Sequence, residues 1–136
     1  MLTTKWLVFL HVLVGIGAVA GGIGGLLDLE SMGITEEALV NGPFESFLIP
    51  VIFLLVVIGI GNLLAGGLLW RRWLYAPLLS LAHGGILCLW IVIQCYVLWL
   101  IAWLHVIFFV LGLVMIILAA LLSITALLPT LVRWIE

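Results

Sequence analysis

The stretch LVFLHVLVGIGAVAGGIGG, residues 7–25, decides the class of fold. Residues 15–20 fit the G-x-G-x-x-G/A fingerprint of dinucleotide-binding proteins, in which a strand precedes the glycines. That fold also needs a parallel sheet with further alternating strands and helices, and nothing after Gly25 supplies them. If the stretch is a helix instead, spacings of four, three, four and three place five residues on one face. They are His11, Gly15, Ala18, Gly22 and Gly25.

This face is typical of a contact between helices in a membrane. Lipid provides little hydrophobic drive between helices, so small residues that allow close backbone approach form the usual contact surface. The predicted helix-packing residues are Gly15, Ala18, Gly22 and Gly25, together with Gly59 and Gly66 in a second apolar stretch. We expect Gly22→Leu to force the helices apart and Gly22→Ala to be mild.

The composition indicates that lipid surrounds most of the chain. Of 136 residues, 68% are hydrophobic and 7% are charged, against about 45–50% and about 25% in soluble domains. Uncharged stretches cover residues 6–27, 46–70 and 73–132, and about 20 residues span a bilayer. The last stretch would measure about 90 Å as one helix, so it must form two spans.

The sequence therefore predicts an all-α membrane protein, a bundle of four transmembrane helices in a single integral membrane domain over residues 1–136. The predicted helices cover about residues 5–27, 46–70, 76–100 and 103–130, and the predicted external loop covers residues 28–45. Six of the seven tryptophans fall near predicted interfaces, where this residue is enriched, and Trp90 alone falls in the middle of a span.

The charges predict the orientation. With four spans, all four basic residues lie on one side, and five of the six acidic residues, including Asp28, Glu36 and Glu37 in the loop, lie on the other. Cytoplasmic segments are enriched in Lys and Arg, so both termini are expected in the cytoplasm. Four basic residues at a membrane surface form no phosphate-binding stripe, and nucleic acid is not an expected partner.

Helix-ending residues refine the boundaries. Ser46 is placed to cap the second helix, and Pro77 to begin the third. Pro129 is expected to end or kink the fourth helix, because proline cannot donate to the carbonyl of Thr125. Within the external loop, Thr35 followed by Glu36 and Glu37 predicts a short helix closed near residues 42–43.

Four polar residues are expected at a similar depth in the cytoplasmic half of the membrane. They are His11, Asn62, His83 and Thr125, at about 9 to 14 Å from the basic edge. The favoured interpretation is that they hydrogen-bond within the protein. Two alternatives are that His11 and His83 ligate haem or a metal ion, and that they relay protons. No cofactor is expected on the favoured interpretation, and the identity of any metal is unknown.

Catalysis has little support in the sequence, which contains no H-E-x-x-H, no C-x-x-C and no paired carboxylates inside a span. We therefore expect a non-catalytic integral membrane protein that acts through helix contacts. It would be an oligomeric small transporter or an accessory subunit of a membrane complex. Its partners would be the lipid bilayer and either further copies of itself or another membrane protein. The alternative is a haem- or metal-binding redox protein that uses His11 and His83.

Four strings occur in an order that resembles a group of small bacterial four-helix inner-membrane proteins. They are GGIGGLLD, GPFESFLIP, NLLAGGLLWRRW and WIVIQ. That group has no established activity. The resemblance implies the four-span topology and a location in the bacterial cytoplasmic membrane, as a multi-pass protein, and it adds nothing about mechanism.

Overall fold

The computed structural model describes residues 2–28, 36–39 and 42–135, and side chains are described except at positions 36, 38 and 127–135. Four helices are long and apolar enough to cross a membrane, and the described residues contain no strand. These candidate spans are Leu2–Leu27, Leu48–Trp70, Ala76–Leu98 and Trp103–Ala126. The predicted all-helical class, with four helices long and apolar enough to cross a membrane, is confirmed.

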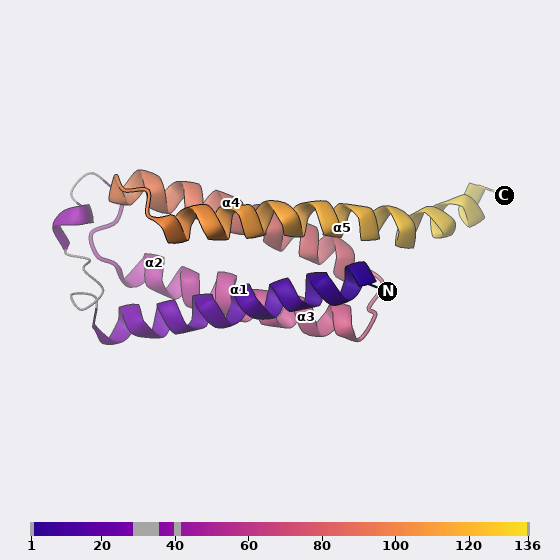
Figure 1. The fold of residues 1–136 in the computed structure, drawn as a ribbon, viewed down its shortest axis with the longest axis horizontal. Coiled ribbons are helices and arrows are strands. Elements are labelled where there is room, and N and C mark those ends of the chain that lie inside the picture. Colours follow the sequence, from indigo (N-terminus) through magenta and orange to yellow (C-terminus); the bar gives the residue numbers. More distant parts are fainter. Residues whose placement is uncertain (1, 29–35, 40–41, 136) are drawn as a thin grey trace.

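The spans run back and forth along the molecule (Figure 1). α1 (Leu2–Leu27) is followed by a short 3₁₀ helix, η2 (Glu36–Leu39), at the far end of the molecule. The second span leads back, α4 (Ala76–Leu98) leads out again, and α5 (Trp103–Ile135) returns. Both ends of the chain therefore lie toward the same end of the molecule, and the last turns of α5 extend past the other helices (Figure 1).

The second span changes its helical type along its length. It begins as α2 (Leu48–Phe53), continues as a π-helical segment, η3 (Leu54–Ile60), and ends as α3 (Gly61–Trp70). At the end of η3 the amide of Gly61 points to the carbonyls of Val56 and Ile58. Because a π segment is one residue wider per hydrogen-bonded turn, it turns the faces of α2 and α3 relative to each other.

The turn after α3 is a Schellman motif without glycine. Trp73 N donates to Leu68 O and Arg72 N donates to Leu69 O, each at 3.0 Å, as this motif requires. Arg72 takes the left-handed conformation with φ of 56°, and Trp99 does the same after α4 with φ of 49°. Bulky residues rarely adopt this conformation. The residue types at these positions therefore do not predict the two turns.

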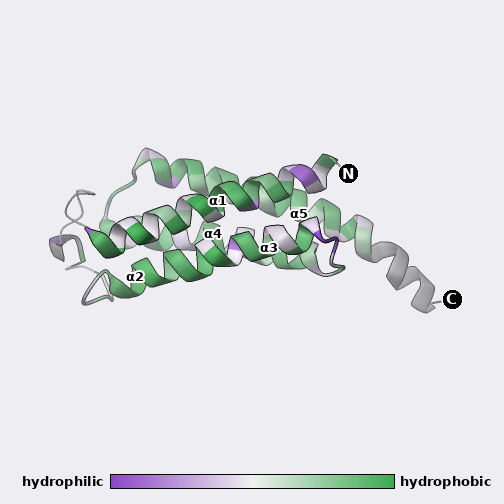
Figure 2. Cartoon of the chain, turned by 90° about the horizontal axis from the view of Figure 1, so that it is seen from below, coloured by the Kyte–Doolittle hydropathy of each residue, from purple (hydrophilic) through white to green (hydrophobic). Residues whose placement is uncertain are grey.

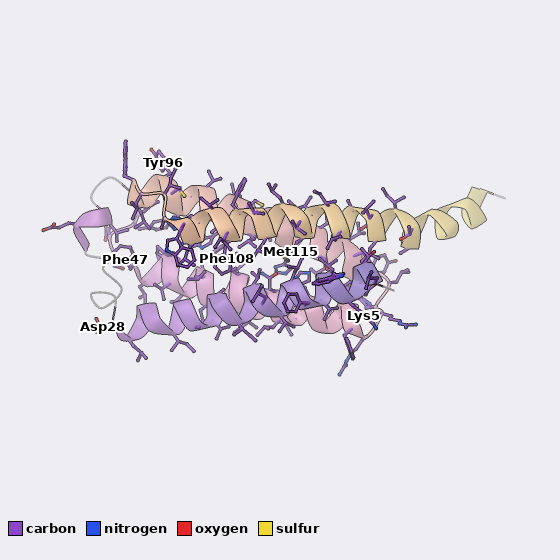
Figure 3. The ribbon with its side chains drawn as sticks, viewed as in Figure 1. Lys5, Asp28, Phe47, Tyr96, Phe108 and Met115 are labelled. Carbon is purple, nitrogen blue, oxygen red and sulfur yellow. The ribbon has the colours of Figure 1, made fainter. Side chains whose placement is uncertain are left out.

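The core lies where α1 and the second span meet α4 and α5. Its fully buried side chains include Leu7, Ile58, Leu87 and Met115. Hydrophobic residues cover most of each helix, including the outward faces (Figure 2). Lys5 and Asp28 lie at opposite ends of α1 (Figure 3). The charged residues therefore lie at the ends of the apolar helices, which suits a protein that spans a bilayer.

The predicted start of the second helix is wrong, and Pro129 does not end the fourth helix. The second span begins at Leu48, with Phe47 rather than Ser46 at the N-cap position and no side-chain cap. Pro50 in the first turn has no N–H, so one of the amides that a cap would satisfy is missing. α5 continues through position 129 to Ile135, because a single proline removes only one hydrogen bond of a long ladder. Pro77 does lie in the first turn of α4, as predicted.

The glycines of α1 pack against the second span. A Cβ atom added at Gly22 would lie 2.7 Å from Leu55 Cβ, and one at Gly15 would lie 2.7 Å from Leu63 Cγ. On the other side of this contact, a Cβ at Gly59 would lie 2.8 Å from Val19 Cγ2 and one at Gly66 would lie 3.1 Å from His11 Cβ. A side chain at Gly22, Gly15 or Gly59 would force its neighbour to shift, and one at Gly66 would fit only tightly, so these glycines allow the close approach of the two helices.

Candidate functional site

The structure brings together three of the four polar residues expected at one depth. His11 on α1 lies beside Asn62 on α3, with 2.8 Å between His11 Nδ1 and Asn62 Oδ1. The ring of His83 on α4 lies with its centroid 6.4 Å from the ring centroid of His11, and the two ring planes are nearly perpendicular. His11 and Asn62 are fully buried. The polar cluster is defined here as His11, Asn62 and His83.

Thr125 does not join the polar cluster. Its side chain is exposed, and its hydroxyl donates to the carbonyls of Leu121 and Leu122 on its own helix. The sequence placed Thr125 at the right depth but could not show which way it faces. A hydroxyl that bonds its own backbone is also already satisfied without a partner on another helix.

The π-helical segment helps to hold Asn62 in place. Asn62 Nδ2 donates to the carbonyl of Ile58, 2.7 Å away within η3. This contact fixes the orientation of the amide, so that Oδ1 faces His11 as an acceptor. His11 Nδ1 is therefore the N–H donor, and its Nε2 carries the free lone pair.

Two nitrogen atoms of the polar cluster, His11 Nε2 and His83 Nδ1, are buried without a hydrogen-bond partner among the described residues. Burying a polar atom without a partner costs about 1 to 3 kcal/mol. Gly61 makes room for the second ring, since a Cβ added there would lie 2.5 Å from His83 Cε1. The two histidine rings therefore lie next to each other, and each has one buried nitrogen without a hydrogen-bond partner among the described residues.

The other predicted residues lie outside the polar cluster. Ala18 and Gly25 are buried on α1, and Asp28 follows the end of that helix. Glu37 is exposed in η2, and the side chain of Glu36 lies outside the described residues. The described side chains contain no group of three or more His, Cys, Asp or Glu residues that could hold a metal ion.

A cavity of about 400 Å³ lies in the other half of the spans, toward η2. We call it the apolar cavity. Two of its lining residues, Phe47 and Phe108, lie toward the end of the molecule opposite Lys5 (Figure 3). Residues from η2 and from every span line it, among them Gly21, Leu39, Leu54, Ile91, Val97 and Leu104.

Part of the loop closes the end of the apolar cavity. Leu39 of η2 is 4% exposed and packs in a cluster with Phe47, Val51 and Val97. The amide of Gly42 donates to the carbonyl of Leu39 at 2.8 Å, which ends the 3₁₀ helix. The described part of the loop is therefore anchored on α2 and α4 rather than lying free at the surface.

Three polar side chains line the otherwise apolar wall, namely Trp90, Gln94 and His105. Trp90 is 5% exposed and stacks on Phe53 with 4.5 Å between ring centroids, and its indole N–H has no acceptor. The amide of Ala102 donates to His105 Nδ1 at 3.1 Å. A nitrogen that accepts carries no proton, so Nε2 of the neutral His105 ring is a donor.

The sequence did not predict the apolar cavity, because its lining residues come from segments far apart in the chain. One signal was present, namely that Trp90 alone among the tryptophans falls in the middle of a span. A buried indole N–H needs an acceptor, and apolar neighbours on its own helix provide none.

Comparison with family models, with curated proteins and with solved structures finds no match for this chain. The function proposed below therefore rests on the geometry of the chain itself.

Proposed function

We propose that this chain is a non-catalytic integral membrane protein that binds a lipid-soluble molecule in the apolar cavity. The ligand has an apolar body and a hydrogen-bond-accepting oxygen, as a quinone or an acyl ester has. In this role the protein serves as a small transporter of that molecule or as an accessory subunit that supplies it to a membrane complex.

The observation that carries the proposal is the unpartnered indole N–H of Trp90 among the lining residues of the apolar cavity. Small-molecule sites have volumes of about 300 to 1,000 Å³, mostly apolar walls and a few polar groups that orient the ligand. The volume of about 400 Å³ falls in this range. An oxygen acceptor on the ligand would satisfy the indole and remove the cost of burying it.

The second donor narrows the chemistry of the ligand. His105 offers Nε2–H because its Nδ1 already accepts from Ala102. Trp90 and His105 offer donors, and the amide of Gln94 can donate or accept, so the polar groups of the wall favour a ligand that accepts hydrogen bonds. The absence of Lys and Arg from residues 73–132 disfavours an anion. A neutral carbonyl compound fits both conditions.

The orientation and location form part of the proposal. The basic residues Lys5, Arg71 and Arg72 belong to one end of the spans, and Asp28, Glu37 and Glu45 belong to the other. By the excess of basic residues on cytoplasmic segments, both termini face the cytoplasm and the apolar cavity lies in the outer half of a bacterial inner membrane. The four spans would act there as one helix bundle.

An oligomer, or a complex with another membrane protein, is the proposed working state. A Cβ atom added at Gly67 would meet nothing within 4 Å among the described residues, so another helix has room to approach at this position. The glycines of α1 give less support to an oligomer than the sequence suggested. A Cβ atom at Gly17 or Gly21, for example, would already contact another helix of the same chain.

The test is to fill the apolar cavity with a larger side chain and to identify the bound compound that the variant no longer carries. Gly21 lines the apolar cavity, and a Cβ there makes only an ordinary contact, 3.5 Å from Leu54 Cδ2. Gly21→Leu therefore directs its added volume into the apolar cavity, and Gly85→Leu places the same side chain on an outward face as the matched control. The purified proteins are extracted with organic solvent, and the extracts are compared by mass spectrometry.

We expect one carbonyl-bearing apolar compound to accompany the wild-type protein and Gly85→Leu, and to be depleted from Gly21→Leu. The mass of the compound distinguishes a quinone from an acyl lipid. Equal amounts in all three extracts would mean that the compound is bulk lipid, and the proposal would fail.

A further inference from the structure

We propose that His11 and His83 form a two-coordinate site for Cu(I), with Asn62 as the positioning residue. This inference is independent of the proposed function, because neither histidine lines the apolar cavity. It rests on the two unpartnered buried nitrogens and on the distance between the rings.

The hydrogen bonds of Asn62 prepare His11 as a ligand. Asn62 donates to Ile58 O and accepts from His11 Nδ1, which leaves the lone pair of His11 on Nε2. Metal-binding histidines generally donate their other ring N–H to an oxygen atom, and this bond fixes the tautomer and the ring orientation. His11 has this arrangement at a position where its side chain is fully buried.

The separation of the rings matches one shared ion. An imidazole nitrogen lies about 2 Å from a bound metal ion and about 1.2 Å from its own ring centre, so two rings on opposite sides of an ion have centres about 6.4 Å apart. The ring centroids of His11 and His83 are 6.4 Å apart, which is the separation required when His11 Nε2 and His83 Nδ1 both face the ion. The nearly perpendicular ring planes are compatible with this arrangement, because rotation about a linear N–metal–N axis is free.

The number and charge of the ligands select the metal ion. Zinc takes four ligands, and calcium and magnesium take six or more oxygen atoms. The described residues hold no group of three or more His, Cys, Asp or Glu side chains that could bind one ion. Residues 6–27, 46–70 and 73–132 contain no carboxylate. Cu(I) is monovalent, has a filled d shell and accepts two ligands in line. A single charge also costs less to bury in a membrane than a double one.

The surroundings of His11 leave little room for haem. A haem would need a slot for its macrocycle between the rings. His11 is instead fully enclosed, with its Cβ against Gly66.

Gly61 provides a test that leaves both ligands in place. A Cβ atom at this position would lie 2.5 Å from His83 Cε1, so Gly61→Ala must displace the ring of His83 from its position opposite His11. Gly67→Ala is the matched control, because a Cβ there meets nothing within 4 Å. A purely structural role for the histidines would not make copper retention depend on Gly61.

The experiment measures Cu(I) retention by the purified full chain in detergent. Cys88 and Cys95 are free thiols and would bind Cu(I) themselves, so all proteins carry Cys88→Ala and Cys95→Ala. Cu(I) is supplied under ascorbate, and bicinchoninate is added as a coloured competitor. Variants at His11, His83 and Gly61 are compared with His105→Ala, which removes the third histidine at a different place in the fold.

We expect one Cu(I) per chain in the parent protein, in His105→Ala and in Gly67→Ala. Retention should be lost in His11→Ala and in His83→Ala, and the affinity should fall about 10- to 100-fold when the positioning residue is changed in Asn62→Ala. X-ray absorption of the loaded parent should show nitrogen neighbours that disappear in His83→Ala. His83 is only half-buried, so His83→Ala should disturb folding less than His11→Ala. The His83→Ala result therefore tests the inference even if His11→Ala does not fold.

Two outcomes would overturn the inference. One is a parent protein that yields all its copper to bicinchoninate. The other is equal retention in the parent, His83→Ala and Gly61→Ala, which would show that copper binds elsewhere.

Discussion

His11 Nδ1 donates to Asn62 Oδ1 across 2.8 Å, and this buried hydrogen bond joins α1 to α3. Asn62 is itself held by the carbonyl of Ile58 in the π-helical segment. The chain thus places a fixed polar contact in the middle of an apolar interface, where an alternative partner from water is absent. The expectation that His11 bonds within the protein agrees with this contact. His83 makes no such bond among the described residues and has an unpartnered Nδ1 instead.

Asn62→Leu should lower the stability of the protein by about 1 kcal/mol, in line with polar contacts measured between helices in membranes. The substitution keeps a similar volume but leaves His11 Nδ1 without its acceptor. Stability is measured by titrating denaturing detergent into mixed micelles. Thr125→Val is the control, because Thr125 bonds only its own helix. If the two variants unfold alike, the His11–Asn62 bond does not stabilise the fold.

Gly22→Ala should be clearly destabilising, contrary to the expectation from sequence that it is mild. A Cβ at this position lies 2.7 Å from Leu55 Cβ and 3.0 Å from Leu55 Cα, and backbone cannot move aside as the end of a side chain can. Overpacking of this kind costs about 1 to 3 kcal/mol. Gly67→Ala should leave thermal stability in detergent unchanged or slightly higher, because alanine favours helix. Equal melting of the two variants would show that α1 and η3 are not in close contact.

Cysteines introduced at Glu37 and at Trp73 should react with a membrane-impermeant reagent from opposite sides. Both positions are exposed, one in η2 and one in the turn between α3 and α4. In intact cells the cysteine at position 37 should be labelled, and the cysteine at position 73 only after the membrane is opened. The experiment uses a background with alanine at positions 88 and 95. Labelling of both from the same side would contradict four spans with both termini in the cytoplasm.

Trp90→Phe should reduce the bound ligand without reducing the stability of the ligand-free protein. The substitution keeps an aromatic ring against Phe53 and removes an indole N–H that has no partner in the part of the chain that the structure describes. Removing an unsatisfied buried donor is neutral or stabilising, whereas a ligand that accepts from it loses a hydrogen bond. The two effects are separated by mass spectrometry of solvent extracts and by melting of the delipidated protein. Unchanged ligand content would exclude Trp90 as its donor.

The sequence predicted the number and the type of the spans because they follow from composition alone. Each uncharged stretch must satisfy its backbone internally in lipid, and a helix is the local way to do so. The π-helical segment over Leu54–Ile60 could not be predicted, since no pattern in its residues distinguishes a π-helix from an α-helix. The left-handed Arg72 and Trp99 were equally hidden, because glycine is the usual signal for that conformation.

The candidate sites were predicted only in part, for a geometric reason. Counting residues from a charged edge gives an expected depth, and this count selected His11, Asn62 and His83, which lie close together in the structure. It gives no information on which way a helix faces, so it also selected Thr125, whose side chain is exposed. The apolar cavity depends on which helices are neighbours and where they diverge, and no pattern within one helix carries that information.

Native mass spectrometry of the wild-type protein, released from detergent with mild activation, tests the proposed function most directly. The proposal predicts a peak at the mass of one chain plus one apolar compound, with the same compound absent from Gly21→Leu and present in Gly85→Leu. A wild-type spectrum that contains only the bare chain, or an adduct that Gly21→Leu retains in full, would contradict the claim that the apolar cavity is a binding site.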